Sequence, residues 1–269
     1  MLGIDVTTIR GDVNPSFGGV NPEPIPENLG ASIAAMKGGS YDLAICNDGD
    51  ADRLGVLDER GAFVSPHKVI ALLALYLVRE KRMHGEIVKT FSTTRLIEKV
   101  ARALGAGFHE TAIGFKYVAD LMLSRDVLVG GEESGGVGFG YFLPERDGVL
   151  SGLMVAQAVA HYRKPLSAII AEMEAEFGAL HYDRRDLHRP VERCAQLLER
   201  ARAGALDAVF GLGFVNREEK DGVKLNFADG TWILFRKSGT EPIIRIYCES
   251  PDAGRVQEML DTATRELDG

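Results

Sequence analysis

The sequence has little of several features that mark specialised protein classes. It has three cysteines, Cys46, Cys194 and Cys248, in 269 residues. Their wide separation shows no zinc-ligand spacing, and their odd number favours a reducing compartment over a disulfide-stabilised secreted fold. The longest apolar run, residues 69–78, is too short to cross a bilayer. The first residues also lack the basic-then-apolar segment of a secretion signal, so we expect a cytoplasmic location.

Positive charge is also in short supply. The sequence holds 31 lysines and arginines against 39 aspartates and glutamates, which gives a net charge of −8 and a pI of about 5.4. This balance argues against a nucleic-acid or anionic-membrane partner, although a local basic pocket can still bind phosphate. With 45% apolar residues, 26% charged residues and no internal repeat, the composition indicates a globular protein of two or three small domains.

The most informative stretch that is present is Asp48-Gly49-Asp50-Ala51-Asp52-Arg53. Carboxylates at positions i, i+2 and i+4 of a short loop can converge on one hard divalent cation. Without an ion, three anions this close would repel one another strongly. Asp48, Asp50 and Asp52 are therefore candidate metal ligands. A plain turn between two strands is the simpler alternative.

A calcium EF-hand is another interpretation of the same spacing. The three aspartates would be loop positions 1, 3 and 5, and Glu59 would be position 12. However, Arg53 stands where that loop needs glycine for its sharp turn. The flanking residues, 43–46 and 54–57, are short apolar runs that predict strands rather than helices. We therefore expect a strand–loop–strand unit.

Hydrophobic patterns divide the chain into three parts, residues 1–62, 63–178 and 179–269. In the first part, the pattern predicts a strand over Ile4–Ile9 and a helix from Asn28 to Gly38. Together with the strand before the aspartates, these elements form only part of an α/β domain. An exposed sheet edge is expected there.

The middle part alternates between strand and helix patterns. Helices are predicted over residues 68–83, 93–105, 115–124, 148–162 and 165–177, and strands over residues 87–91, from 108 and over 127–129. Such alternation implies a largely parallel sheet covered by helices on both faces. In the third part, Asp221-Gly222 and Asp229-Gly230 are hairpin signals. The expected fold is thus α/β/α, with one partial and one complete mixed-sheet domain, followed by an α+β domain with an antiparallel sheet.

Two further loops carry residue types suited to ligand binding. Gly131-Glu132-Glu133-Ser134-Gly135-Gly136 follows a predicted buried strand, and its polar side chains can hydrogen bond hydroxyl groups. Arg236-Lys237-Ser238-Gly239-Thr240-Glu241-Pro242 joins two predicted strands, and its arginine and hydroxyls suit a phosphate. The first loop fits neither a dinucleotide-binding pattern nor a serine-hydrolase elbow, and the second is not a Walker loop. Flexible surface loops are the simpler alternatives.

In this order, the three stretches resemble loops of the α-D-phosphohexomutases, the phosphoglucomutase/phosphomannomutase family. The resemblance covers the second half of the family's domain 2 and its domains 3 and 4. It implies Mg²⁺ on the three aspartates with Arg53 assisting catalysis, sugar-hydroxyl binding by Glu132 and Ser134, and acid or base catalysis by Lys116, which follows a turn at Gly114. It also implies a phosphate-binding set comprising Arg236, Ser238, Gly239, Thr240 and Arg245.

The family interconverts hexose 1-phosphates and 6-phosphates by intramolecular phosphotransfer, an isomerase reaction that passes through a phosphoserine and a hexose 1,6-bisphosphate. A phosphorylated hexose is therefore the expected substrate, with the bisphosphate as activator. The family's phosphoserine lies in a Ser-His-Asn-Pro motif, and this sequence contains no Ser-His pair. A non-catalytic sugar-phosphate-binding protein is the alternative. Self-association, or pairing with the absent N-terminal region, is expected at the partial domain.

We predict that the 269-residue chain alone shows no phosphohexomutase turnover, even with Mg²⁺ and a bisphosphate activator, because good binding cannot replace a missing nucleophile. A coupled assay on purified chain, freed of host mutase, measures this directly. Ligand binding measured on the same preparation separates an inactive binder from misfolded protein. Turnover by the purified chain would mean that a nucleophile outside these motifs acts.

Overall fold

The computed structural model describes residues 4–237 and 242–269. They form two compact units, each assembled from more than one stretch of chain. The first unit comprises the residues up to Lys89 together with 97–109 and 114–173, and the second comprises 90–96, 110–113 and 174 onward. The three-part division inferred from the sequence stays a prediction. Within the described ranges, no helix is long and apolar enough to cross a membrane.

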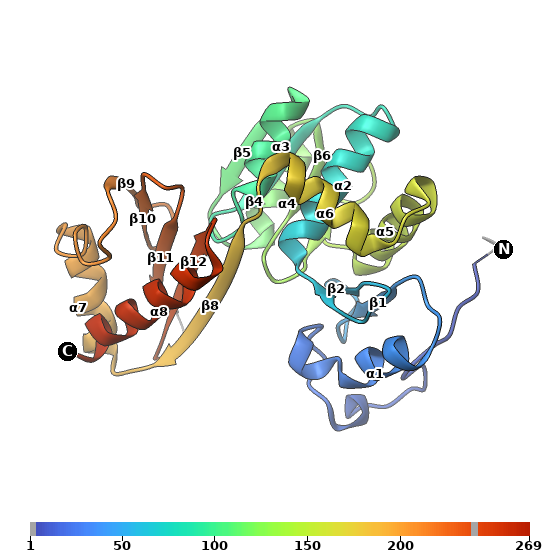
Figure 1. Cartoon of the computed structure of the whole chain (residues 1–269), viewed down its shortest axis with the longest axis horizontal. Coiled ribbons are helices and arrows are strands. Elements are labelled where there is room, and N and C mark those ends of the chain that lie inside the picture. The colour runs from blue at the N-terminus through green and yellow to red at the C-terminus, as the bar shows by residue number, and fades with distance from the viewer. Residues whose placement is uncertain (1–3, 238–241) are drawn as a thin grey trace. The chain divides into compact units, whose positions relative to one another are not determined.

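The beginning of the first unit is a small antiparallel sheet beside one helix (Figure 1). Strands β1 (Ala44–Asn47), β2 (Leu54–Leu57) and β3 (Phe63–Val64) pair in that order. Helix α1 (Gly30–Gly38) occupies the predicted helical region. A buried cluster joins helix and sheet, consisting of Leu29, Met36 and Leu57.

The strand predicted over Ile4–Ile9 is wrong. These residues form no strand in the structure, and the side chain of Val6 is 79% exposed. An unpaired strand leaves its backbone N–H and C=O groups without ladder partners, so local β-propensity alone does not establish one. Self-association, or binding of a partner, at the partial domain stays a prediction.

The central sheet is mixed, with strand order β5-β4-β6-β7. Its strands are β4 (Glu86–Thr90), β5 (Phe108–Thr111), β6 (Val127–Gly131) and β7 (Val137–Gly138). Strands β4 and β6 are parallel, as the alternating pattern predicts, while β7 runs antiparallel to β6 at the edge. The predicted α/β fold class is confirmed.

Helices alternate along the chain with the strands of this sheet or follow them. They are α2 (Pro66–Leu75), α3 (Leu96–Leu104), α4 (Phe115–Ser124), α5 (Gly148–Tyr162) and α6 (Leu166–Phe177). A Cβ at Gly130 would overlap Val118 of α4, and one at Gly131 would lie 2.5 Å from Ile70 Cδ1 of α2. Because successive strand residues face opposite sides of a sheet, α4 and α2 cover opposite faces of β6. The helix predicted over residues 68–83 is α2 continued by a π-helical turn, Tyr76–Glu80.

The second unit is built on a five-stranded antiparallel sheet of order β8-β12-β11-β10-β9 (Figure 1). Its strands are β8 (His181–His188), β9 (Phe214–Glu218), β10 (Val223–Phe227), β11 (Trp232–Lys237) and β12 (Ile243–Ser250). Both predicted hairpins are confirmed, since β9, β10 and β11 are joined by tight turns at Asp221-Gly222 and Asp229-Gly230.

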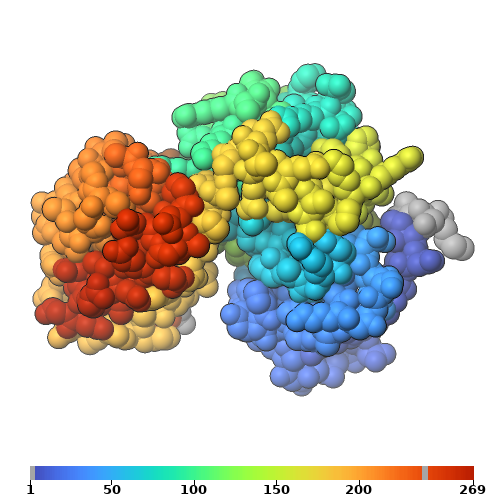
Figure 2. Space-filling model, in the orientation of Figure 1, coloured from blue at the N-terminus to red at the C-terminus, as the bar shows by residue number. Residues whose placement is uncertain are grey.

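The two faces of this sheet are covered differently. Helices α7 (Val191–Arg202) and α8 (Ala253–Asp268) pack on one face over a large apolar core, and Figure 2 shows α8 in red as the outer layer. On the opposite face, Trp232, Leu234 and Tyr247 pack against Phe91 and Ile113. The last two residues come from the short segments 90–96 and 110–113, which therefore act as part of this unit.

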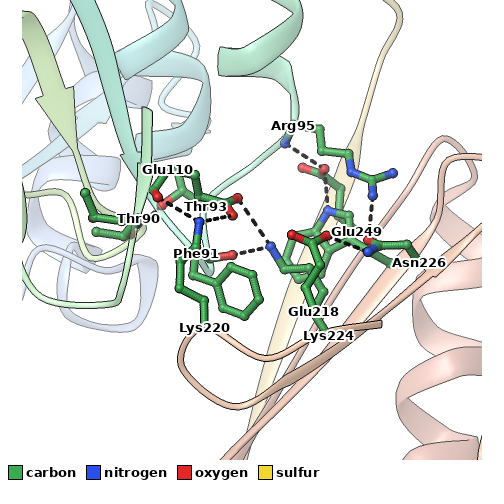
Figure 3. A network of polar contacts seen from close by, with 12 residues as sticks. Thr90, Phe91, Thr93, Arg95, Glu110, Glu218, Lys220, Lys224, Asn226 and Glu249 are labelled. Atoms are coloured by element: carbon green, nitrogen blue, oxygen red, sulfur yellow. Dashed lines mark hydrogen bonds and ion pairs between the residues drawn. The ribbon is translucent and has the colours of Figure 1, made fainter. Parts of the chain in front are cut away.

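Lys224 ties these segments to the sheet (Figure 3). Its side chain is 4% exposed, and Nζ donates to the Phe91 carbonyl oxygen at 2.6 Å. The same nitrogen lies 3.7 Å from the centroid of the Phe91 ring, 4.8 Å from that of Trp232 and 3.5 Å from Glu110 Oε2. A buried ammonium is costly unless paired, and here a carboxylate, a carbonyl oxygen and two aromatic faces surround it.

A second group of contacts holds segment 90–96 (Figure 3). The fully buried Glu249 accepts hydrogen bonds from Trp232 Nε1 at 2.8 Å and from the backbone N–H of Arg95 at 2.9 Å. The Arg95 guanidinium donates to Asn226 Oδ1 at 2.5 Å. Several polar groups on the helix-free face, Glu249 Oε1 among them, thus bond to residues far away in the sequence.

Replacing Lys224 with methionine should lower the free energy of unfolding of the second unit by about 2–3 kcal/mol, because it removes the charge that Glu110 and the aromatic rings surround. The single tryptophan, Trp232, lies in this unit and reports its unfolding in denaturant by fluorescence.

Lys220→Met is the matched control. Lys220 also pairs with Glu110, at 3.2 Å, but is 39% exposed, so its loss should cost less than about 1 kcal/mol. Equal losses in the two variants would contradict a stabilising role for the buried contacts of Lys224.

Candidate functional site

The loop of residues 48–53 joins β1 to β2, and the pairing of Asn47 with Leu54 brackets it. Oxygen atoms of its three aspartates lie within 4.8 Å of one another. The Arg53 backbone N–H donates to Asp48 Oδ1 at 3.0 Å, which closes the loop. Short antiparallel strands therefore hold the carboxylates together in the way that the spacing predicts.

The electrostatics of this cluster fit a cation. Burial and then hydrogen bonding to Asp48 raise the pKa of Asp52, and the charge of Asp50 acts in the same direction, whereas Arg146 lowers it. Oδ1 of Asp52 is buried and accepts no hydrogen bond from the described residues. Carboxylate oxygens are the ligands that hard divalent cations prefer. These residues could thus hold a metal ion.

The EF-hand interpretation is wrong. The loop lies between two antiparallel strands rather than two helices. Glu59, the would-be twelfth ligand, instead accepts hydrogen bonds from the backbone N–H (3.2 Å) and the hydroxyl of Ser167.

Two arginines lie beside the aspartates. Arg53 Nε lies 3.6 Å from Asp48 Oδ2 and 3.8 Å from Asp52 Oδ1. Arg146 forms an ion pair with Asp52 and a second one with Glu132 Oε2 at 3.4 Å. Arg146 therefore links the candidate metal loop to the candidate sugar loop. The sequence does not single it out.

The start of α5 places Arg146. The Asp147 side chain caps this helix, and the Gly148 N–H donates to the Ala51 carbonyl oxygen at 3.0 Å. A Cβ at Gly148 would lie 2.5 Å from the Arg53 carbonyl oxygen, so only glycine permits this approach. The Asp-Gly capping signal predicts where a helix begins, but it does not tell which loop that helix meets.

The turn between β6 and β7 lies directly against the aspartate loop. The Leu54 N–H donates to the Gly135 carbonyl oxygen at 2.9 Å, and Arg53 forms a β-bridge with Gly136. Within the turn, the Gly135 N–H donates to the Glu132 carbonyl oxygen at 3.2 Å. Ser134 lies half-buried in the same turn. Two of the three predicted loops are therefore joined through their backbones.

Glu132 is a buried carboxyl group. Burial, and then the charge of Glu133, raise its pKa to about 7, although Arg146 and Arg53 act against the shift. Near neutral pH both protonation states of Glu132 are consequently populated. A carboxyl group in this condition can accept from or donate to a sugar hydroxyl.

Lys116 is exposed in the first turn of α4, and its Nζ lies 4.7 Å from the ring centroid of Tyr117. The neighbouring Phe115 ring lies 5.8 Å from Arg146 Cζ. The start of α4 is thus near the arginine that joins the two loops. A catalytic role for Lys116 stays a prediction.

In the second unit, Arg236 on β11 lies directly opposite Arg245 on β12. Each has its own carboxylate: Arg236 Nε lies 3.0 Å from Asp221 Oδ1, and Arg245 Nε lies 3.3 Å from Asp186 Oδ2. Two adjacent guanidinium groups suit a dianionic phosphate. The other predicted members of this set lie outside the described residues, namely Ser238, Gly239 and Thr240.

Family models of three successive domains match the chain. All are described as phosphoglucomutase/phosphomannomutase: alpha/beta/alpha domain II over residues 1–61, alpha/beta/alpha domain III over residues 65–177, and the C-terminal domain over residues 184–266. The chain belongs to this family. The resemblance inferred from its three loops is confirmed.

Curated relatives and solved structures agree with this membership. A phosphoglucomutase/phosphomannomutase of Thermococcus kodakarensis is 33% identical over 99% of the chain and 56% of its own length. A phosphoglucosamine mutase of Methanocaldococcus jannaschii is 29% identical over 97% of the chain and 57% of its own length. The crystal structure of a putative phosphomannomutase from Thermus thermophilus is 38% identical, with a TM-score of 0.85 over 100% of this chain and 56% of that one. The chain thus spans about half the length of these relatives.

Titration of the chain with Mg²⁺ should show weak binding, because three carboxylates leave several positions of an octahedral ion to water. Asp50→Asn removes a ligand and a charge from the exposed member of the cluster, so we expect it to abolish measurable binding in calorimetry. Asp42→Asn, an exposed aspartate of the same unit outside the loop, should leave binding unchanged. Unaltered affinity in Asp50→Asn would refute the assignment, and tight Ca²⁺ binding would favour another kind of site.

Proposed function

We propose that this chain supplies the metal-binding, sugar-binding and phosphate-binding parts of a phosphohexomutase. The complete reaction would interconvert a hexose 1-phosphate and a hexose 6-phosphate through a phosphoserine and a hexose 1,6-bisphosphate. One observation carries the proposal: the aspartate loop and the Glu132–Gly136 turn are joined by backbone hydrogen bonding, and Arg146 pairs with both Asp52 and Glu132. The candidate metal ligands and the candidate hydroxyl-binding residues are thereby held next to each other.

The proposed roles follow from charge and hydrogen-bonding capacity. Bound to the three aspartates, Mg²⁺ would neutralise negative charge on a transferring phosphoryl group. Arg53, whose guanidinium lies beside the aspartates, would add positive charge at the same place. Glu132 and Ser134 would bind sugar hydroxyls, which suits a buried carboxyl group and a hydroxyl in one turn. Lys116 would serve as acid or base.

The second unit would bind the phosphate that does not react. Arg236 and Arg245 present two guanidinium groups from neighbouring strands at the base of the predicted phosphate loop. A bidentate or paired arginine contact recognises phosphate by geometry as well as by charge. Such a contact would be indifferent to which end of the hexose carries the phosphate, as a 1,6-interconversion requires.

The substrate class is a phosphorylated hexose: glucose, mannose or an amino sugar. The named relatives include both a phosphoglucomutase/phosphomannomutase and a phosphoglucosamine mutase. The negative net charge favours a small-molecule partner over a nucleic acid or an anionic membrane surface.

Arg236→Ala should weaken the binding of glucose 6-phosphate by about 10- to 150-fold, because a charge-assisted contact contributes about 1.5–3 kcal/mol. Binding of unphosphorylated glucose should change little. Calorimetric or NMR titration of both ligands measures the difference.

Arg217→Ala is the control, since Arg217 is an aspartate-paired arginine of the same unit that no predicted loop contains. Equal weakening of both sugars by Arg236→Ala would show that the phosphate role is wrong.

A further inference from the structure

Asp221 occupies the turn between β9 and β10 and uses both carboxylate oxygens. Oδ1 accepts from Arg236 Nε at 3.0 Å, and Oδ2 accepts from the backbone N–H of Ile113 at 3.1 Å. The two donors come from different parts of the second unit. A carboxylate held at both oxygens cannot rotate without breaking a hydrogen bond to a charged or backbone donor.

The turn that carries Asp221 is itself fixed against the arginine. Gly222 has φ of +98°, and a Cβ there would overlap the Phe235 carbonyl oxygen and lie 3.2 Å from Arg236 Cα. Glycine is therefore needed both for the backbone conformation and for the close approach. The second donor to Asp221, the Ile113 N–H, is fixed as well, because the Ile113 side chain packs against the buried cluster of Trp232, Leu234 and Tyr247.

Two properties of Arg236 make a fixed hydrogen-bond acceptor such as Asp221 important. Like charges directly opposite each other on neighbouring strands repel, and Arg236 faces Arg245 across the β11–β12 pair. A free arginine side chain also samples many rotamers, whose loss opposes binding. The bond from Arg236 Nε to Asp221 Oδ1 restricts the orientation of the guanidinium.

We infer that Asp221 is a positioning residue for phosphate recognition, which orients the Arg236 guanidinium before the ligand arrives. The inference rests on the phosphate-binding role proposed for Arg236. A residue of the β9–β10 hairpin turn would thus affect the affinity for phosphate, although Asp221 is itself an anion and does not bind phosphate.

Charge and position make opposite predictions for Asp221→Asn. The variant loses a negative charge near an anion-binding arginine, so a purely electrostatic effect would tighten phosphate binding. Asparagine keeps the size of the side chain but offers one acceptor oxygen, so it cannot accept from both Arg236 and Ile113. If position matters, binding weakens despite the gain in net positive charge. We expect weakening by at least about fivefold.

The test uses the full chain, with glucose 6-phosphate and inorganic phosphate as probes in calorimetric titration. Asp207→Asn is the matched control: the Asp207–Arg217 pair has an oxygen–nitrogen distance of 2.5 Å and side-chain exposures of 28% and 20%, against 26% and 22% for Asp221 and Arg236. This control should leave both affinities unchanged. Asp221→Glu keeps the charge but moves the carboxylate by one methylene, so it should weaken binding as Asp221→Asn does.

A double-mutant cycle completes the test. In the Arg236→Ala background, Asp221→Asn should no longer weaken phosphate binding, because the guanidinium that it orients is gone. If Arg236→Ala itself does not weaken binding, the proposed function of Arg236 fails. If Arg236→Ala weakens binding while Asp221→Asn tightens it or leaves it unchanged, the positioning role is overturned and the proposed function stands. Near-ultraviolet circular dichroism of Trp232 checks folding, and Asp221→Glu decides the question if Asp221→Asn unfolds.

Discussion

Like charges lie close together in both units, and the opposite charges placed around them determine much of the remaining structure. In the first unit, the three aspartates of residues 48–52 are accompanied by Arg53 and Arg146. In the second, Arg236 and Arg245 face each other and each has an aspartate at Nε. Because repulsion at such distances is strong wherever water is scarce, these partners have to be positioned accurately. The fold does this with tight backbone contacts.

Glycines make those contacts possible. Gly148 brings the first turn of α5 against the aspartate loop, and Gly222 brings the β9–β10 turn against Arg236. In both cases the residue before the glycine is an aspartate that is fixed by backbone N–H groups, Asp147 as a helix cap and Asp221 through Ile113. Similar local chemistry thus places Arg146 beside the carboxylates and holds Arg236 in its strand pair. In both candidate binding regions, an Asp-Gly pair thus helps to position an arginine, although the folds around them differ.

The sequence predicts best what is encoded locally. The aspartate spacing, the hairpin signals and the alternation of strands and helices each span few residues, so they indicate the candidate metal loop and the fold class directly. The role of Arg146 cannot be predicted in this way, because Arg146 lies 94 positions after Asp52 in the chain. The two side chains pair only when α5 packs against the aspartate loop. The strand over Ile4–Ile9 fails for a related reason, since a strand needs a neighbour that local propensity cannot supply. Asp221 appears in the sequence only as a turn residue, and its two acceptor roles depend on the tertiary arrangement.

The assembly of the second unit from separated segments bears on how the chain becomes ordered during synthesis. Phe91 and Ile113 leave the ribosome well over a hundred residues before Trp232 and Tyr247, with which they pack. At about 5–20 residues per second, these apolar side chains wait on the order of ten seconds for the sheet that buries them. Conversely, a fragment that begins after α6 would lack Phe91 and Ile113 and would expose the helix-free face of that sheet. The compact unit is consequently not a contiguous stretch of sequence, and a graft of residues 174–269 alone would omit residues 90–96 and 110–113.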